Sequence, residues 1–165
     1  MKAISAIPSK IYDLQGLKNN ISQQRLKGRT IAFTNGVFDI LHEGHIASLS
    51  EAAGLADFLV VAVNSDASVK RLKGNSRPVN NQEARSILLA SLIMVDAVII
   101  FEEDTPAEII KTILPDVLVK GGDYTVDQIA GAKEVLVNGG TVHLAKIVPG
   151  ISTTGIITKM KEMKG

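Results

Sequence analysis

The chain has 165 residues, of which 45% are hydrophobic, a composition that predicts a single globular unit with an ordinary buried core. It contains no cysteine, which excludes disulfides, thiolate nucleophiles and zinc sites built on thiolates. The net charge of +1 and the absence of tryptophan disfavour a protein that binds nucleic acid. No apolar run approaches the roughly 20 residues that cross a bilayer, and the N-terminus is unlike a signal peptide. We therefore expect a cytoplasmic protein that binds neither nucleic acid nor membrane.

The first 28 residues are polar and carry an amphipathic stretch at 12–26, which we expect to form a helix on the outside of the main fold. After this segment, short runs rich in Val, Ile or Phe alternate with helical patterns. We therefore expect an N-terminal helical extension at 1–28 and one main domain at 29–165. The expected strands of that domain are 30–34, 58–64, 97–101, 117–120 and 141–147.

Helical patterns fill the intervals between these strands. Thr105 and Pro106 are expected to open one helix, as a capping hydroxyl followed by proline at the first helical position, and Pro115 to end it. The other expected helices are 44–56, 81–95, 126–137 and 152–164. This alternation predicts an α/β fold, a doubly wound (Rossmann-like) sheet of five parallel strands with helices on both faces. Ligands bind beyond the carboxyl ends of the strands in such folds, so functional residues are expected directly after strands.

The segment after the first strand, 34–45, reads TNGVFDILHEGH, carries two of the three histidines and leads into a helix. Gly36 lets the backbone approach a phosphate, and the helix N-terminus offers free N–H groups and a positive dipole end. His42 and His45 can then hydrogen-bond an α-phosphate and stabilise the charge that develops there. The simpler alternative is that both histidines only cap the helix.

A zinc site at these histidines is a weaker alternative, because the third protein ligand is missing and only His143 remains, on a distant strand. Magnesium bound mainly through nucleotide phosphates would leave little mark in the sequence. We therefore predict no metal ligands among the side chains.

Near the C-terminus, the segment 150–155 reads GISTTG, follows the last strand and begins the last helix. Its three hydroxyls gather at a helix N-terminus, where they can cap the helix, donate to a bound phosphate, or do both.

Two further groups of polar residues follow strands. After the second strand come Asp66 and a basic loop in which Lys73 and Arg77 are favoured for binding phosphate, although such loops are often only solvated. Arg85 lies on the next helix, where a surface salt bridge is as plausible as a ligand contact. After the fourth strand, residues 120–124 read KGGDY and suit either a tight turn or a nucleotide contact.

The chain lacks both the GxGxxG pattern of dinucleotide-binding enzymes and the GxxxxGK[ST] phosphate loop.

The run 35–39, NGVFD, with HEGH at 42–45 and ISTT at 151–154 resembles the HxGH nucleotidyltransferases of the cytidylyltransferase-like superfamily. More narrowly, the segments 33–42, 63–69, 77–79 and 119–124 are similar to the adenylyltransferase domain of ADP-heptose synthesis. The resemblance extends from about residue 30 to the end, so 29–165 would be the nucleotidyltransferase domain.

This resemblance implies transfer of AMP from ATP to D-glycero-β-D-manno-heptose 1-phosphate, giving pyrophosphate and ADP-heptose, a precursor of lipopolysaccharide core. The sugar phosphate is already anionic, so in-line positioning and charge stabilisation by the histidines, Mg²⁺ and basic side chains would supply the catalysis. The resemblance also implies a homodimer. The family often carries this domain fused to a sugar kinase, and since no kinase sequence is present here, we expect a separate upstream sugar kinase to make the 1-phosphate.

The candidate site residues form three sets. The candidate catalytic residues are His42, His45 and Lys73. The residues expected at the phosphate of the acceptor are Asp66, Lys73, Arg77 and Arg85. The residues expected to bind the nucleotide are Thr34, Asn35, Gly36, Phe38, Gly44, His45, Lys120, Gly121, Asp123, Ile151, Ser152, Thr153 and Thr154.

Three alternatives remain open. Two lie in the same superfamily, a cytidylyltransferase that uses glycerol 3-phosphate and an adenylyltransferase that uses flavin mononucleotide. The glycerol-phosphate enzymes carry an arginine three residues before the glycine of GISTT, where this chain has Ile147, which disfavours that alternative. The third is a regulatory protein that binds ATP without turnover.

Overall fold

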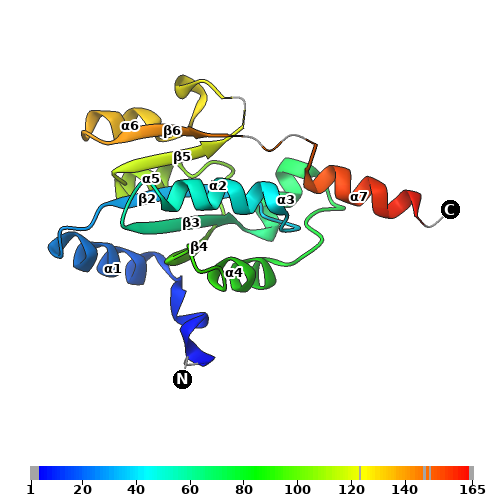
Figure 1. Ribbon diagram of the computed structural model, residues 1–165, viewed down its shortest axis with the longest axis horizontal. Coiled ribbons are helices and arrows are strands. Elements are labelled where there is room, and N and C mark those ends of the chain that lie inside the picture. The colour runs from blue at the N-terminus through cyan, green and yellow to red at the C-terminus, as the bar shows by residue number, and fades with distance from the viewer. Residues whose placement is uncertain (1–3, 123, 147, 149, 164–165) are drawn as a thin grey trace.

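One sheet runs through the computed structural model, which describes residues 4–122, 124–146, 148 and 150–163 (Figure 1). The strands of the sheet are β1 (Ile11–Tyr12), β2 (Ile31–Gly36), β3 (Phe58–Asn64), β4 (Ala97–Phe101), β5 (Val117–Gly121) and β6 (Thr141–Ala145). They lie in the order β1-β4-β3-β2-β5-β6, and every neighbouring pair is parallel. The predicted α/β fold with a parallel sheet is confirmed.

The predicted number of five strands is wrong, because β1 adds a sixth at one edge of the sheet. Ile11 and Tyr12 pair with Val98 and Ile99 of β4. A strand of two residues leaves no recognisable run in a sequence, and Tyr12 was expected to begin a helix. That helix begins two residues later, after Asp13, whose side chain caps it.

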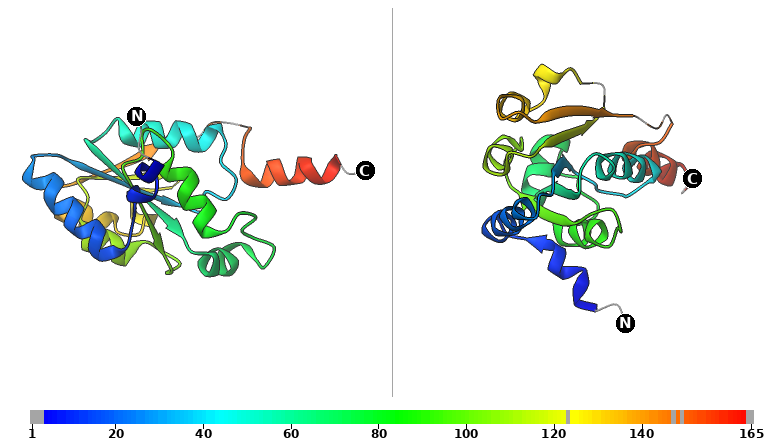
Figure 2. Two further views of the ribbon diagram at one scale, coloured as in Figure 1. Left: turned by 90° about the horizontal axis from the view of Figure 1, so that it is seen from below. Right: turned by 60° about the vertical axis from the view of Figure 1, so that its left-hand side comes forward.

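Helices cover both faces of the sheet, as predicted (Figure 2). Leu17, Ile110 and Val135 anchor α1, α5 and α6 in one hydrophobic core, and Leu49 and Leu89 anchor α2 and α4 in the other. The α-helices of the described residues are α1 (Leu14–Leu26), α2 (Glu43–Ala53), α3 (Asp66–Lys73), α4 (Gln82–Ala90), α5 (Ala107–Ile113), α6 (Ala132–Val137) and α7 (Thr153–Glu162). Short 3₁₀ turns are present at η1 (Ile4–Ala6), η2 (Pro8–Lys10) and η3 (Val126–Gln128).

The basic segment after β3 was expected to be a loop, but its first part is the helix α3. The Ser65 side chain caps this helix by accepting a hydrogen bond from the amide of Ser68. Only Ser68 and Val69 of the helix are buried, so the sequence has no apolar stripe that would have predicted it.

Two other helices differ from the prediction. Pro106 is itself the residue before α5 and no side chain caps that helix, so Thr105 is not the predicted cap. The helix expected at 126–137 is divided into η3 and α6, because Gly131 has a φ of +82° and interrupts helical geometry. The expected end at Pro115 is confirmed, since Leu114 adopts a left-handed conformation directly before it.

The order of the strands reverses at β2, and this reversal determines where the ligand crevice lies. β2 pairs with β3 on one side, and on its other side it pairs with β5, which comes later in the chain. Adjacent crossovers then lie on opposite faces, and a crevice opens at the carboxyl ends of β2 and β5.

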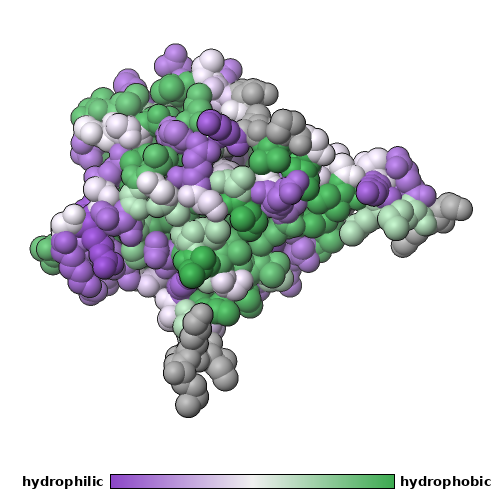
Figure 3. Space-filling view, in the orientation of Figure 1, coloured by the Kyte–Doolittle hydropathy of each residue, from purple (hydrophilic) through white to green (hydrophobic). Residues whose placement is uncertain are grey.

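The last helix, α7, extends away from the rest of the chain (Figures 1 and 2), and it has no buried residue. Hydrophobic surface is visible on the α4 side and near the start of α7 (Figure 3), and Ile87 and Leu88 of α4 are exposed. No helix in the described part of the chain combines the length and apolar composition that a bilayer crossing requires.

Candidate active site

A cavity of about 360 Å³ opens at the carboxyl ends of β2 and β5. It brings together residues that the sequence predicted from separate motifs, namely Thr34, Asn35, Gly36, Phe38, His42, Gly44, His45, Lys120, Gly121 and Ile151. Ser48, Lys146 and Val148 also line it and were not predicted as site residues. Ser48 lies three residues after His45 on α2, so helical spacing could have indicated it, whereas no signal pointed to Val148.

His42 and His45 lie at the start of α2 with their rings stacked, at a distance of 3.8 Å between centroids and an angle of 21°. The backbone carbonyl of His42 accepts a hydrogen bond from the amide of His45 at 2.9 Å, which sets this spacing. Glycine fits closely at position 44, because a Cβ there would lie 3.1 Å from the His42 ring. Both Nδ1 atoms are buried, and no described residue hydrogen-bonds to them.

Burial, followed by the nearby His42, lowers the pKa of His45 to about 4. Burial also lowers the pKa of His42, which Glu43 partly opposes. Both rings are therefore neutral near pH 7, and each offers one N–H donor and one acceptor. Since neither side chain caps α2, the alternative that the histidines only cap the helix is not supported.

The turn after β2 holds Phe38 in a left-handed conformation with a φ of 48°. Its ring contacts His45 edge-on, at 5.2 Å between centroids. The ring also fills the space beside Gly36, where a Cβ would lie 3.0 Å away. Phe38 thereby packs against both His45 and Gly36, and all three residues line the cavity.

Lys120 is one of two lysines in the wall of the cavity, the other being Lys146. Its Nζ donates a hydrogen bond of 3.2 Å to Oδ1 of Asn35 and lies 5.5 Å from the centroid of the Tyr124 ring. Burial lowers the pKa of Lys120. A lysine with so few polar partners is well suited to bind an anionic ligand.

A second cavity, of about 340 Å³, adjoins the first. Both cavities are lined by Asn35, Gly36, Val37, Lys120 and Tyr124. Lys73, at the end of α3, lines the second cavity only. The predicted Lys73 thus lies next to the histidine-lined cavity but outside it.

Arg77, by contrast, is paired with Asp39 and lines neither cavity. Its Nε lies 2.6 Å from Oδ2 of Asp39, and the amides of Val79 and Asn80 donate to the same carboxylate at 2.8 and 2.9 Å. Burial alone would raise the pKa of Asp39, but these hydrogen bonds and the Arg77 charge outweigh it and lower the pKa. This carboxylate holds the chain around residue 79 against the turn after β2.

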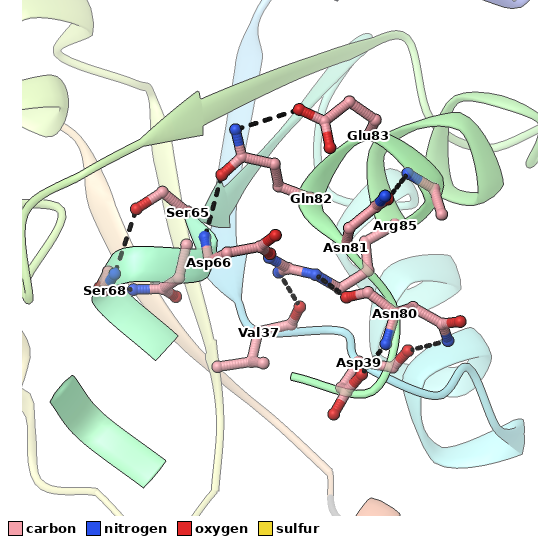
Figure 4. A network of polar contacts seen from close by, with 12 residues as sticks. Val37, Asp39, Ser65, Asp66, Ser68, Asn80, Asn81, Gln82, Glu83 and Arg85 are labelled. Atoms are coloured by element: carbon pink, nitrogen blue, oxygen red, sulfur yellow. Dashed lines mark hydrogen bonds and ion pairs between the residues drawn. The ribbon is translucent and has the colours of Figure 1, made fainter. Parts of the chain in front are cut away.

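Arg85 is fully buried and occupies the centre of the polar network in Figure 4. Its guanidinium donates to the carbonyls of Val37 and Asn80 at 2.7 and 3.0 Å and pairs with Asp66 at 2.7 Å. These contacts indicate that Arg85 positions the turn after β2. Neither Arg85 nor Asp66 lines a cavity, so their predicted contact with the acceptor's phosphate stays a prediction.

The hydroxyl cluster begins α7 beside the same turn. Ser152 caps the helix by accepting a hydrogen bond from the amide of Gly155, and Oγ1 of Thr153 lies 3.5 Å from the carbonyl of Ile40. Ser152, Thr153 and Thr154 do not line the cavity, although Ile151 does. Asp123 and Ile147 lie outside the described residues.

The third histidine, His143, lies elsewhere, with Nε2 at 2.7 Å from Oε1 of Glu51. Among the described residues, no three side chains of the metal-binding types lie close enough together to hold an ion. The arrangement at the cavity, with neutral imidazoles, a half-buried lysine and a helix N-terminus, suits hydrogen bonding to phosphate.

Comparison with known proteins relates the chain to one family. A model of the family described as cytidylyltransferase-like matches residues 33–159. The bifunctional protein HldE of Rhodospirillum rubrum is 52% identical over 157 residues, which cover 95% of this chain and 32% of that protein. The proteins of the same name from Cronobacter sakazakii and Haemophilus influenzae are 56% and 55% identical, covering 88% and 90% of this chain and 31% of theirs. The chain spans about a third of the length of these relatives.

Solved structures are similar as well. A lipopolysaccharide core biosynthesis protein from Thermoplasma volcanium has a TM-score of 0.61 and 30% sequence identity, over 73% of this chain and 99% of that one. A pantoate-beta-alanine ligase from Francisella tularensis has a TM-score of 0.60 over 94% of this chain and 78% of that one. Its identity is only 14%, so this likeness concerns the fold alone.

Proposed function

Since the chain belongs to the cytidylyltransferase-like family of nucleotidyltransferases, we propose that it transfers AMP from ATP to D-glycero-β-D-manno-heptose 1-phosphate. The products are ADP-heptose and pyrophosphate. The observation that carries the proposal is the stacked pair of neutral histidines at the start of α2, inside a cavity at the switch point of the sheet. This is the place where an α/β sheet binds nucleotides.

The similar proteins support the choice of acceptor. Relatives more than 50% identical are named HldE, and the Thermoplasma volcanium protein is titled a lipopolysaccharide core biosynthesis protein. The sequence segments that resemble the adenylyltransferase domain of ADP-heptose synthesis include the turn after β2 and the end of β5, which both line the cavity. The heptose phosphate therefore fits better than glycerol 3-phosphate.

The residues of the cavity fit the chemistry. The nucleophile is an oxygen of the sugar phosphate and is already anionic, so no general base is required. His42, His45 and Lys120 would donate hydrogen bonds to the phosphates of ATP, whose α-phosphate redistributes charge as pyrophosphate leaves. These donors are held by packing against Phe38 and by the hydrogen bond to Asn35, so little reorganisation is needed.

Magnesium fits the site as an ion held by ATP and water. The carboxylates of Asp39 and Asp66 are engaged by Arg77 and Arg85, and neutral imidazoles are poor ligands for Mg²⁺. When bound, the ion would neutralise part of the phosphate charge. ATP would thus bring most of the metal's ligands itself.

We propose a homodimer, and the exposed Ile93 and the exposed apolar face of α4 are surfaces that association could cover. We also propose a cytoplasmic location, an N-terminal extension at 1–28 ahead of the catalytic domain, and an upstream sugar kinase activity that supplies the heptose phosphate.

Pyrophosphate release tests the function. The protein is incubated with Mg²⁺ and either ATP or CTP, each with heptose 1-phosphate or glycerol 3-phosphate. Turnover only with ATP and the heptose is the expected result. Turnover with CTP and glycerol 3-phosphate would overturn the substrates, and no release in any pairing would favour the regulatory alternative.

A further inference from the structure

The segment that leaves β6 brings a second lysine to the histidine-lined cavity. Sheet pairing between β5 and β6 ends at Gly121 and Ala145, so Lys146 is the first residue beyond the strand. Lys146 lines the same cavity as Lys120. The described residues that line this cavity include these two lysines and no aspartate or glutamate. The cavity wall therefore carries positive charge without a compensating carboxylate, which favours an anionic ligand.

Glu51 holds the backbone of Lys146 at the point where the sheet no longer does. Its Oε2 accepts a hydrogen bond of 3.1 Å from the Lys146 amide. Glu51 belongs to α2, the helix that begins at the two histidines, and Leu49 anchors this helix in the hydrophobic core. One carboxylate thus joins the histidine side of the cavity to the segment after β6.

The other carboxylate oxygen of Glu51 contacts His143, a residue that is already held in the sheet. Oε1 lies 2.7 Å from Nε2 of His143, and His143 pairs with Val119 of β5. This contact, followed by the hydrogen bond from the Lys146 amide, lowers the pKa of Glu51, so the carboxylate stays ionised near pH 7. The two side chains are 28% and 36% exposed, and a partly exposed contact between two independently held elements adds little to their placement. The bond to the Lys146 amide is therefore the one that positions a cavity residue.

We propose that Lys146 binds a phosphate of the nucleotide and that Glu51 is the residue that positions it. The inference rests on the proposed function in taking ATP as the nucleotide. Lys120 and Lys146 would contact the triphosphate from the ends of two neighbouring strands, while the histidines contact it from α2. A carboxylate close to an anion site is unfavourable by charge alone, because it repels phosphate. The hydrogen bond to the Lys146 amide explains why this position carries one.

Calorimetry with Mg²⁺ and ATP tests the role of Lys146. Lys146→Ala is expected to raise the Kd for ATP about tenfold through loss of a charge-assisted hydrogen bond, whereas Lys146→Arg should stay within about twofold. Lys18→Ala removes the same charge from an exposed position on α1, outside the cavity, and should leave the Kd unchanged. Equal effects of Lys146→Ala and Lys18→Ala would overturn the assignment of Lys146.

The direction of the change in ATP affinity separates positioning from charge at Glu51. Removal of a carboxylate should tighten ATP binding by charge alone, whereas loss of the bond to the Lys146 amide should weaken it. Glu51→Ala is therefore expected to raise the Kd for ATP about fivefold. Glu51→Gln keeps an oxygen acceptor for the Lys146 amide, so it should bind ATP at least as tightly as the unmodified protein.

A double variant shows whether Glu51 acts through Lys146. In a protein that already carries Lys146→Ala, Glu51→Ala should cause no further weakening of ATP binding. Equal weakening with and without Lys146 would mean that Glu51 supports the fold in general, and the positioning role would be overturned. Tighter binding of ATP by Glu51→Ala alone would overturn it as well.

Binding and turnover are measured separately, which distinguishes failure of the inference from failure of the function. If the variants weaken ATP binding as expected but the unmodified protein releases no pyrophosphate in any pairing, the inference stands and the function fails. If the unmodified protein turns over with ATP and Lys146→Ala leaves the Kd unchanged, the function stands and the inference is overturned. Binding of neither ATP nor CTP would overturn both.

Discussion

The imidazole rings of His42 and His45 lie stacked 3.8 Å apart at the start of α2, and neither ring caps the helix. Rings stacked at this distance cannot both carry a charge without repulsion, and the proximity of His42 contributes to the lowered pKa of His45. The pair therefore meets a phosphate as two neutral donors fixed relative to each other, which is the arrangement that stabilises charge as it develops.

Removal of His45 should affect turnover more than nucleotide binding. His45→Ala is expected to lower kcat by about 10²–10³-fold, since a donor to the transition state is lost, while the Kd for ATP changes by less than about fivefold. Steady-state kinetics and calorimetry measure the two quantities. His143→Ala is the control, because His143 lies outside the cavity, on Glu51. Equal losses in kcat and in ATP affinity would contradict the catalytic role.

The half-buried position of His45 also predicts a pH dependence of stability. Burial, followed by the proximity of His42, gives His45 a pKa of about 4 in the folded protein, against 6.5 for an unperturbed imidazole. Between these pH values the unfolded chain binds a proton that the folded protein excludes. The free energy of unfolding should therefore be unaffected by this group above pH 6.5 and should fall as the pH decreases towards 4.

Urea denaturation at a series of pH values measures this dependence. His45→Asn should reduce the slope between pH 4 and 6.5, because the excluded proton site is gone. The same substitution at His143, which lies outside the cavity, serves as the control. A slope in His45→Asn as steep as in the unmodified protein would show that His45 does not titrate in this way.

Arg85 is expected to matter for stability through its buried contacts. Arg85→Ala leaves the carboxylate of Asp66 and the carbonyls of Val37 and Asn80 without their donor, which should cost about 3–5 kcal/mol of unfolding free energy. Arg71→Ala removes an ion pair to Asp104 whose side chains are about half exposed, and it should cost less than about 1 kcal/mol. Similar losses in the two variants would contradict the structural role of Arg85.

The sequence predicted the parts of the fold that depend on local pattern. β3 and β4 have the predicted bounds, because strands buried on both faces appear as uninterrupted apolar runs. The helix α3 was missed, since only Ser68 and Val69 of it are buried. The edge strand β1 was missed because two residues carry no periodicity.

The same distinction holds at the site. His42, Gly44 and His45 form one short motif, so their proximity follows from helical spacing. The partners of the arginines do not follow from spacing, because Arg77 and Asp39 are 38 residues apart and the bond between them depends on the tertiary fold. The sequence therefore predicted the histidine cluster, whereas it could not indicate which residues pair with Arg77 and Arg85.

Gly131, which divides the helix expected at 126–137, gives the last prediction. It has a φ of +82°, and a Cβ there would lie 2.6 Å from Cγ2 of Ile110 in the hydrophobic core. Gly139 has a φ of +84° and nothing within 4 Å of its Cβ position, so Gly139→Ala isolates the conformational cost, about 1–2 kcal/mol. Gly131→Ala should lower the free energy of unfolding by about 1–3 kcal/mol more than Gly139→Ala does, because the added methyl group overpacks the core. Urea denaturation of both variants measures the difference, and equal losses would mean that Ile110 moves aside freely and that backbone conformation alone requires glycine at this position.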